Sequence, residues 1–278
     1  MILEHEIPTK SKLYFGKSAK LKREIEHSAA KLLEKEGFSE ILTPIFSYHQ
    51  QDSFSDKKRL IRINDAQNSE VSLRADTTVD VVRIVTNRLS RSNKDKKWFY
   101  IQPVYSYPTK EQHQIGAEII DGSLKEVVEI SFGLLNTLEI DFTFQVANMA
   151  IADILVKNYG FSLDDIKNIK LDKILSSSYS WIENLVAIDS IKDLQDLTIY
   201  PDDIKGQLLK IKELVDNLEC KDVLISPLFY APMRYYDSLV FRAFRGNDLY
   251  LIGGTYNIKG VNGVGFALYT DKVIAKKI

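Results

Sequence analysis

Apolar residues recur every three or four positions in several parts of the chain, which predicts amphipathic helices. Residues 18–36 carry the clearest example, and Gly37 stands where such a helix would end. Its apolar face consists of Leu21, Ile25, Ala29, Leu32 and Leu33. The same spacing predicts a helix after Asp76, Thr77 and Thr78, and two more over residues 124–137 and 145–158.

Strands are predicted where β-rich runs alternate with turn residues. Phe38 to Phe46 is predicted to be one strand, placed at an edge or an interface by Pro44, which cannot donate a hydrogen bond. Residues 59–74 predict a hairpin, and residues 98–107 and 113–120 predict a second one. The last part returns to strands, YYDSLVFRAF, LYLIGGTYN and VGFALYT, with a turn at Gly246-Asn247 and a terminal helix.

This order of elements predicts an α+β fold, with a mainly antiparallel sheet flanked by helices. We expect a single domain over residues 1–278, with a helical insertion at about 160–222. The chain contains neither a GxGxxG motif nor a GxxxxGK[ST] phosphate loop, so a dinucleotide-binding fold is not expected.

Composition narrows the class of protein. Hydrophobic residues make up 45% and charged residues 27%, which is ordinary for a globular protein. No apolar run reaches the roughly 18 residues of a membrane span, and the charged start MILEHEIPTK is unlike a secretory signal. The single cysteine, Cys220, fits a reducing cytoplasm, where we expect the protein to work. A net charge of −1 gives no basic surplus for binding nucleic acid.

Candidate binding chemistry lies in LRADTT (73–78), HQIGAE (113–118), MRYYDSLVF (233–241) and LIGGTYN (251–257). Alternation along a strand places Gln114 and Glu118 on one face, and Asp76 supplies an anion that would suit an ammonium group. Less specific readings stay open: Asp76 as only a helix cap, Glu118 as solvent-facing, and Gly253-Gly254 as only a bulge. The histidines share no zinc-ligand spacing, and we expect neither a metal nor a cofactor.

Six segments, in order, resemble the catalytic core of histidyl-tRNA synthetase, a class II aminoacyl-tRNA synthetase. GFSEILTPIF is similar to the first family motif, LRADTT to "LRPEGT", and FYIQPVYSY with HQIGAE to "FY…P.FR.E" and "HQ.G.E". YYDSLVFRAF is similar to the strand of "RGLDYYTG.VFE", LIGGTYN to "GGRYD", and VGFALYTDKVI to the third motif, "VGF..G..R". The resemblance covers nearly the whole chain.

Departures from the family occur where the synthetases hold ATP. The arginine of the second motif falls at Ser106, that of "RGLDYY" at Ala231, and that of the third motif at Lys272. The transition state of adenylation builds negative charge, which a guanidinium meets and Ser106 or Ala231 cannot. We also expect the family's anticodon-binding domain to be absent. These losses imply a non-catalytic relative and no binding of tRNA.

The resemblance then extends to the regulatory subunits of ATP phosphoribosyltransferase. It implies a partner, the short catalytic subunit, in the first step of histidine biosynthesis, with this chain activating that subunit and sensing L-histidine. The alternative is a diverged amino-acid ligase that still forms an adenylate.

The resemblance also implies a histidine pocket and a dimer. The pocket would be lined by Asp76, Gln114, Glu118, and Tyr235 or Tyr236, of which one tyrosine is expected in the core. Pro44 would lie at the interface of a homodimer within a hetero-oligomer.

Overall fold

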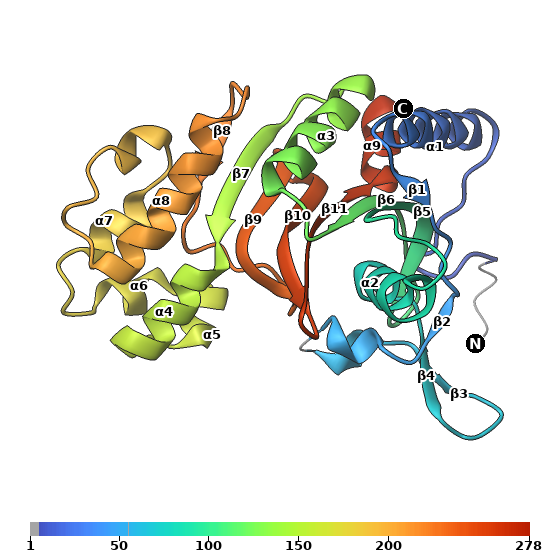
Figure 1. Ribbon diagram of the computed structural model, residues 1–278, viewed down its shortest axis with the longest axis horizontal. Coiled ribbons are helices and arrows are strands. Elements are labelled where there is room, and N and C mark those ends of the chain that lie inside the picture. Colours follow the sequence, from blue (N-terminus) through green and yellow to red (C-terminus); the bar gives the residue numbers. More distant parts are fainter. Residues whose placement is uncertain (1–5, 55) are drawn as a thin grey trace. The chain divides into compact units, whose positions relative to one another are not determined.

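The computed structural model describes residues 6–54 and 56–278, so His5 and the start of the predicted charged N-terminus lie outside the described part. Its contacts divide the chain into two compact units. Unit 1 comprises the described residues of Met1–Asp141, together with Met233–Tyr235 and Asn257–Ile278. Unit 2 comprises Phe142–Pro232 and Tyr236–Tyr256. Figure 1 shows the elements of both units.

Unit 1 is built on four strands that lie in the order β1-β5-β6-β11. β5 pairs in parallel with β1, whereas the β5–β6 and β6–β11 pairs are antiparallel. These strands span Ser39–Glu40 (β1), Lys97–Ser106 (β5), Lys110–Ile120 (β6) and Val261–Tyr269 (β11). A small separate sheet has the order β2-β4-β3, with bounds Phe46–Ser47 (β2), Glu70–Leu73 (β4) and Arg62–Asn64 (β3).

Helices cover both faces of the unit 1 strands. Figure 1 shows α1, α3 and α9 on one side of β5 and β6, and α2 on the other. Their bounds are Gly16–Lys35 (α1), Thr78–Ile84 (α2), Leu124–Thr137 (α3) and Thr270–Lys277 (α9), and π-helical turns at Val85–Leu89 (η3) extend α2. Short 3-10 helices span Gln50–Asp52 (η1) and Lys57–Arg59 (η2). Gly37 ends α1 with a φ of 83°, and the amide of Phe38 then donates to the carbonyl of Leu33.

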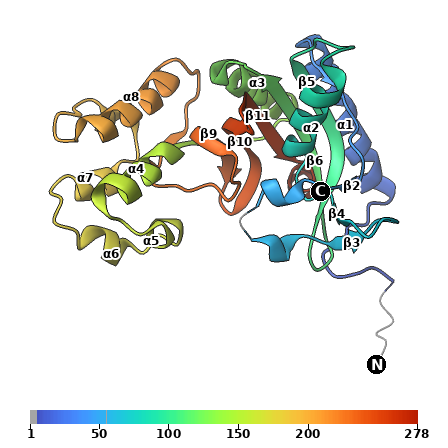
Figure 2. The same cartoon turned by 60° about the horizontal axis from the view of Figure 1, so that its bottom comes forward.

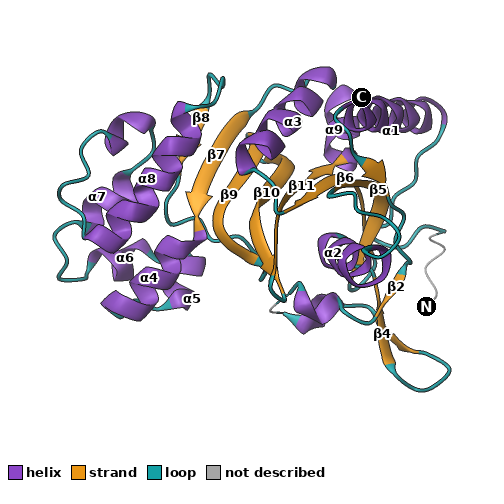
Figure 3. Cartoon of the chain, viewed as in Figure 1, coloured by secondary structure: helices purple, strands orange, loops and turns teal. Residues whose placement is uncertain are grey.

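Unit 2 has four strands in the order β10-β9-β7-β8 and most of the chain's short helices. Its strands span Thr143–Asn148 (β7), Val223–Ile225 (β8), Tyr236–Arg245 (β9) and Asp248–Ile258 (β10). Its helices are Met149–Tyr159 (α4), Leu163–Lys167 (α5), Leu171–Leu175 (α6), Ile182–Ala187 (α7), Ile191–Leu194 (η4) and Asp202–Asp216 (α8). Figure 3 separates these helices from the strands by colour. Tyr159, Tyr179 and Trp181 pack ring against ring among the helices.

The predicted α+β class is confirmed, and most predicted elements are present. The helix at 18–36, both hairpins and the three late strands occur within a few residues of their predicted bounds. Among the strand pairs of residues 6–54 and 56–278 whose register is defined, β1–β5 and β7–β8 are parallel and the others are antiparallel.

Two predicted elements were wrong. The single strand over Phe38–Phe46 is instead two short strands, β1 and β2, separated by the segment that holds Pro44. The predicted helix at 145–158 starts only at Met149, because the preceding residues pair as β7 with β8 and β9. Asn148 then caps α4 by accepting from the amide of Ala150.

Across residues 6–54 and 56–278 we find no helix with the length and apolar character needed to span a bilayer.

Candidate functional site

A buried polar cluster surrounds the start of α2 in unit 1. Gln50 organises it, because its amide oxygen accepts from the backbone amides of Ala75 and Asp76 and its amide nitrogen donates to Asp80 Oδ2 and to the Asp76 carbonyl. Gln50 is fully buried, so these hydrogen bonds satisfy a side chain that has no access to water. Ser47 Oγ donates to the other oxygen of Asp80 at 2.6 Å.

Two carboxyl groups at the start of α2, those of Asp76 and Asp80, favour the protonated form more than exposed carboxyl groups do. Burial raises the pKa of Asp80 to about 6, and the neighbouring charge of Asp76 adds to the rise, although Ser47 and Gln50 oppose it. Burial also raises the pKa of Asp76, against the hydrogen bonds from Val79, Tyr235 and Ser53. Buried carboxylates of this kind attract a cation, because a cation offsets the charge that burial penalises.

Asp76 contacts one of the predicted tyrosines. Its Oδ2 accepts from the Tyr235 hydroxyl at 2.9 Å, and its Oδ1 accepts from Ser53 Oγ at 3.3 Å and from the Val79 amide at 3.2 Å. The last bond caps the first turn of α2. Asp76 therefore both caps this helix and lies in the polar cluster. The role of a helix cap is thus compatible with a place in a binding site.

Glu118 points inward from β6 and not toward solvent. It is 1% exposed, and its Oε1 accepts from Thr78 Oγ1 at 2.7 Å at the start of α2. A Cβ on Gly265, the residue opposite on β11, would lie 1.9 Å from Glu118 Oε2. Glycine at this position therefore leaves room for the carboxylate.

Gln114 is buried on the same strand and lies opposite Tyr269 of β11. Burial and the nearby charge of Asp76 together raise the pKa of Tyr269 to about 12, which assigns Tyr269 to the same cluster. Gln50, Thr78 and Tyr269 were missed from the sequence. Tyr269 had a signal, because it stands where the string "VGF..G..R" has its glycine.

The other predicted positions are divided between the two units. Tyr236 begins β9 in unit 2 and packs with the buried residues Ala147, Met149, Ala231 and Val240. Ala231 is thus part of an apolar cluster in unit 2. Ser106 ends β5 opposite Lys110, and Lys272 lies in the first turn of α9.

Pro44 lies in an irregular segment that a buried arginine holds. Arg74 Nη1 donates to the carbonyls of Thr43 and Pro44 at 2.7 and 3.1 Å, and its Nε and Nη2 donate to the carbonyl of Pro103. These contacts use backbone carbonyls within the segment that we predicted to be part of one strand. They also give Arg74 a structural role.

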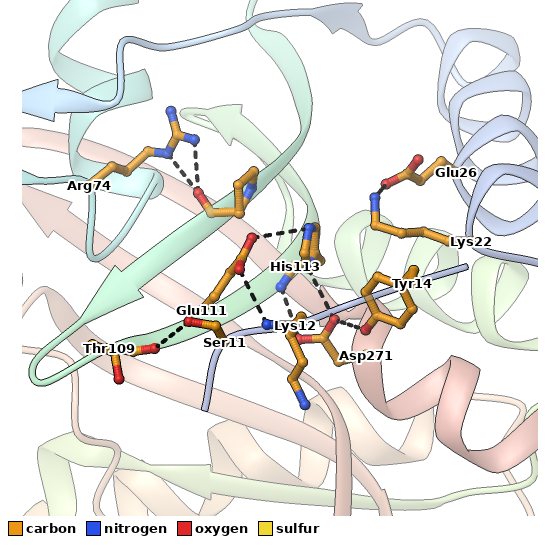
Figure 4. A network of polar contacts seen from close by, with 11 residues as sticks. Ser11, Lys12, Tyr14, Lys22, Glu26, Arg74, Thr109, Glu111, His113 and Asp271 are labelled. Atoms are coloured by element: carbon orange, nitrogen blue, oxygen red, sulfur yellow. Dashed lines mark hydrogen bonds and ion pairs between the residues drawn. The ribbon is translucent and has the colours of Figure 1, made fainter. Parts of the chain in front are cut away.

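A second polar network lies on the opposite face of β6 (Figure 4). Asp271 accepts from the His113 amide at 3.1 Å and from the Tyr14 hydroxyl, and it lies 3.2 Å from His113 Nδ1. Glu111 lies 3.6 Å from the other ring nitrogen of His113. Burial opposes ionisation of Asp271, but the hydrogen bonds from His113 and Tyr14 hold its pKa below the usual value. Sequence reasoning used His113 only as part of a motif.

The cluster at α2 has the chemistry of a small polar binding site. Asp76 and Glu118 supply carboxylates, Gln114 an amide and Tyr235 a hydroxyl, all in unit 1. An ammonium group and an imidazole are ligands that such groups accept. In the described part of the chain no group of three or more His, Cys, Asp or Glu side chains has the arrangement of a metal site.

The chain is similar in sequence and in fold to known proteins of one family. A sequence model of the histidyl-tRNA synthetase family matches residues 15–197. The chain is 42% identical to an ATP phosphoribosyltransferase regulatory subunit of Wolinella succinogenes, over 99% of this chain and 97% of that one. It is 41% identical to a subunit of the same name in Helicobacter hepaticus, over 99% of this chain and 98% of that one.

Two solved structures share the fold. One is described as an ATP phosphoribosyltransferase regulatory subunit/histidyl-tRNA synthetase from Bacillus halodurans, with a TM-score of 0.85, 20% identity, and coverage of 98% of this chain and 83% of that one. The other is an ATP phosphoribosyl transferase (HisG:HisZ) complex from Thermotoga maritima, with a TM-score of 0.67, 22% identity, and coverage of 90% and 97%. Because the chain is 42% and 41% identical to two regulatory subunits over nearly its whole length, it belongs to the family of ATP phosphoribosyltransferase regulatory subunits, which has the histidyl-tRNA synthetase fold.

Proposed function

We propose that the protein is the regulatory subunit of an ATP phosphoribosyltransferase and acts in histidine biosynthesis by activating a short catalytic subunit. The observation that carries this proposal is the identity of 42% and 41% to two regulatory subunits over 99% of the chain. The sequence offers no phosphate loop of its own, and the partner would therefore carry out the transfer of the phosphoribosyl group. We place the complex in the cytoplasm, where Cys220, the single cysteine of this chain, would stay reduced.

Co-purification tests the partnership. The tagged chain, co-expressed with the short ATP phosphoribosyltransferase subunit of the same genome, should retain that subunit in a fixed ratio through gel filtration. A tagged histidyl-tRNA synthetase from the same cells is the matched control, because it shares the fold and should retain none. Loss of the catalytic subunit at the first wash in both preparations would contradict the proposal.

The match to the histidyl-tRNA synthetase family supports a second candidate, a diverged ligase that adenylates an amino acid. Serine at 106, alanine at 231 and lysine at 272 argue against it, because each replaces an arginine of the family motifs. Loss of one such donor slows catalysis about a hundredfold or more. Histidine-dependent exchange of pyrophosphate into ATP should therefore be absent, and exchange at a synthetase-like rate would favour the ligase.

We further propose that the cluster at α2 binds free L-histidine. Asp76 would take the ammonium group, and Glu118 would accept from the imidazole, with Gln114 and Tyr235 between them. The burial of both carboxylates, which are 7% and 1% exposed, supports this assignment, because a cationic ligand offsets the charge that burial penalises. Tyr236 stands outside the assignment, because it packs in unit 2.

Calorimetry on the purified chain tests the histidine site. Glu118→Gln keeps an acceptor for Thr78 but removes the charge, so it should weaken histidine binding about tenfold or more. Glu129→Gln on the exposed face of α3 is the matched control and should leave binding unchanged. Equal affinity in wild type and Glu118→Gln would place histidine elsewhere in the complex.

A further inference from the structure

Unit 2 contains a cavity that the proposed function does not use. It has a volume of about 320 Å³ and lies among α5, α6, α7, β7, β9 and the loop 226–229. Its walls are mainly aliphatic and include Ile166, Ile174, Leu185, Ile188 and Leu228. Figure 2 shows these helices from a second direction. The volume lies at the lower end of the range for small-molecule sites.

The floor of this cavity is made of hydrogen-bond donors. Arg242 on β9 donates through Nε at 2.7 Å, and through Nη2, to Gln145 Oε1 on β7. Because a guanidinium only donates, Gln145 must present its oxygen to Arg242. The Gln145 amide nitrogen and the remaining Arg242 N–H groups have no acceptor among the described residues, so the floor offers donors without a built-in partner.

Arg242 has no counterion within residues 6–54 and 56–278. No carboxylate there lies within ion-pair distance of it, and no aspartate or glutamate lines the cavity. Its guanidinium carbon lies 3.9 Å from the ring centroid of Phe229 and 5.5 Å from that of Phe244. Burial lowers the pKa of Arg242, as expected for a cation held by rings and an amide alone. The family string "YYTG.VFE" has a glutamate at this position.

A residue at the rim of the cavity, Ile169, has a strained backbone conformation. Ile169 has a φ of 51°, a conformation that a β-branched residue rarely adopts, and its side chain is 65% exposed. Leu171, which also lines the cavity, is 42% exposed. Strain of this kind persists where surrounding structure or function requires it.

We propose that this cavity binds a small monocarboxylate with a branched aliphatic or aromatic body. The carboxylate accepts from Arg242 and Gln145, the body fills the aliphatic walls, and Ile169 and Leu171 cover it at the rim. A free amino acid fits less well, because no acidic side chain lines the cavity to accept from its ammonium group. The binding site is therefore distinct in chemistry from the carboxylate cluster at α2.

Calorimetry of the full chain with 3-phenylpropanoate, 3-phenylpropanamide and phenylalanine tests the proposal without any mutation. The carboxylate should bind about 10- to 100-fold more tightly than the neutral amide, because charge-assisted hydrogen bonds to arginine are lost in the amide. Phenylalanine should also bind more weakly than the carboxylate. Equal binding of acid and amide, or no heat from the acid at about 10 mM, would overturn the proposal.

Matched variants then locate the site. Arg242→Gln should reduce binding of 3-phenylpropanoate to the level of the amide. Arg245→Gln lies on the same strand but outside the cavity, where Arg245 pairs with Asp222 at 2.8 Å, and it should bind like wild type. Unchanged binding by a folded Arg242→Gln variant, checked by its melting curve, would place the ligand elsewhere and contradict the assignment.

Discussion

Gly265 and Gly116 of unit 1 lie where a neighbouring side chain leaves no room for a Cβ. A Cβ on Gly265 would lie 1.9 Å from Glu118 Oε2 and 2.7 Å from the carbonyl of Ala117. A Cβ on Gly116 would lie 2.2 Å from the ring of Tyr100, which is itself buried. Backbone and buried side chains cannot move aside at low cost in a packed interior.

We expect Gly265→Ala to lower the free energy of unfolding by about 1–3 kcal/mol, because it displaces Glu118 from Thr78. Gly206→Ala is the matched control, since Gly206 lies within α8 with nothing within 4 Å of the added carbon. That change should stabilise the protein by about 0.5–1 kcal/mol. Urea denaturation measures both, and a Gly265→Ala variant as stable as wild type would show that the strand pair adapts.

The raised pKa of Asp80 predicts how the free energy of unfolding depends on pH. Its folded pKa, about 6, lies above the ordinary aspartate value of 3.8, so the folded state binds more protons than the unfolded state between these values. Stability from this group is therefore present at low pH and falls as pH rises from about 4 to about 6, by at most about 3 kcal/mol.

Asp80→Asn should remove this dependence. Asparagine can accept from Gln50 with its oxygen and donate to Ser47 with its nitrogen, so it mimics the protonated acid. The difference in unfolding free energy between the variant and wild type should grow in favour of the variant from pH 4 to pH 6. This difference excludes carboxyl groups with a lowered pKa, such as Asp271, which are common to both proteins. A constant difference across this range would contradict the raised pKa.

Individual side chains of the cluster were only partly predictable. Alternation along a strand correctly put Gln114 and Glu118 on one face, and both are buried. Gln50 had no signal, because it lies in a short 3-10 turn and its role depends on four groups that are distant in sequence. Tyr235 and Tyr236 alternate as expected, but only the structure shows which of them reaches Asp76.

Most elements were predictable, because their burial follows from local periodicity. The exceptions involve partners that are distant in sequence. Arg74 takes the carbonyls of Thr43 and Pro44 and prevents a continuous strand there. β7 forms over residues predicted to be helical because β8 and β9 flank it. Local patterns carry no information about such partners.

The segment between α5 and α6 holds the strained residue Ile169. Asparagine tolerates a positive φ better than a β-branched residue does, so Ile169→Asn should raise the free energy of unfolding by about 1 kcal/mol. Ile199→Asn is the control, since Ile199 is 50% exposed and is not among the residues with a positive φ. Thermal melts compare the two, and equal effects on stability would mean that Ile169 stores no strain.

At the scale of the whole molecule, we predict a homodimer formed around Pro44. Leu42, Ile45 and Phe46 beside it are 70%, 47% and 58% exposed, which is unusual for three neighbouring large apolar residues. Leu42→Glu should shift the protein toward the monomer in sedimentation velocity. Leu209→Glu, on the exposed side of α8, should leave the distribution unchanged. A wild-type protein that sediments as a monomer at micromolar concentration would contradict the dimer.

The most direct test of the regulatory role is reconstitution of ATP phosphoribosyltransferase activity from purified subunits. We expect the short catalytic subunit alone to have low activity and this chain alone to have none. Activity should rise and then saturate as this chain is added to a constant concentration of the catalytic subunit. Activity of the catalytic subunit that stays the same at every concentration of this chain would contradict the regulatory role.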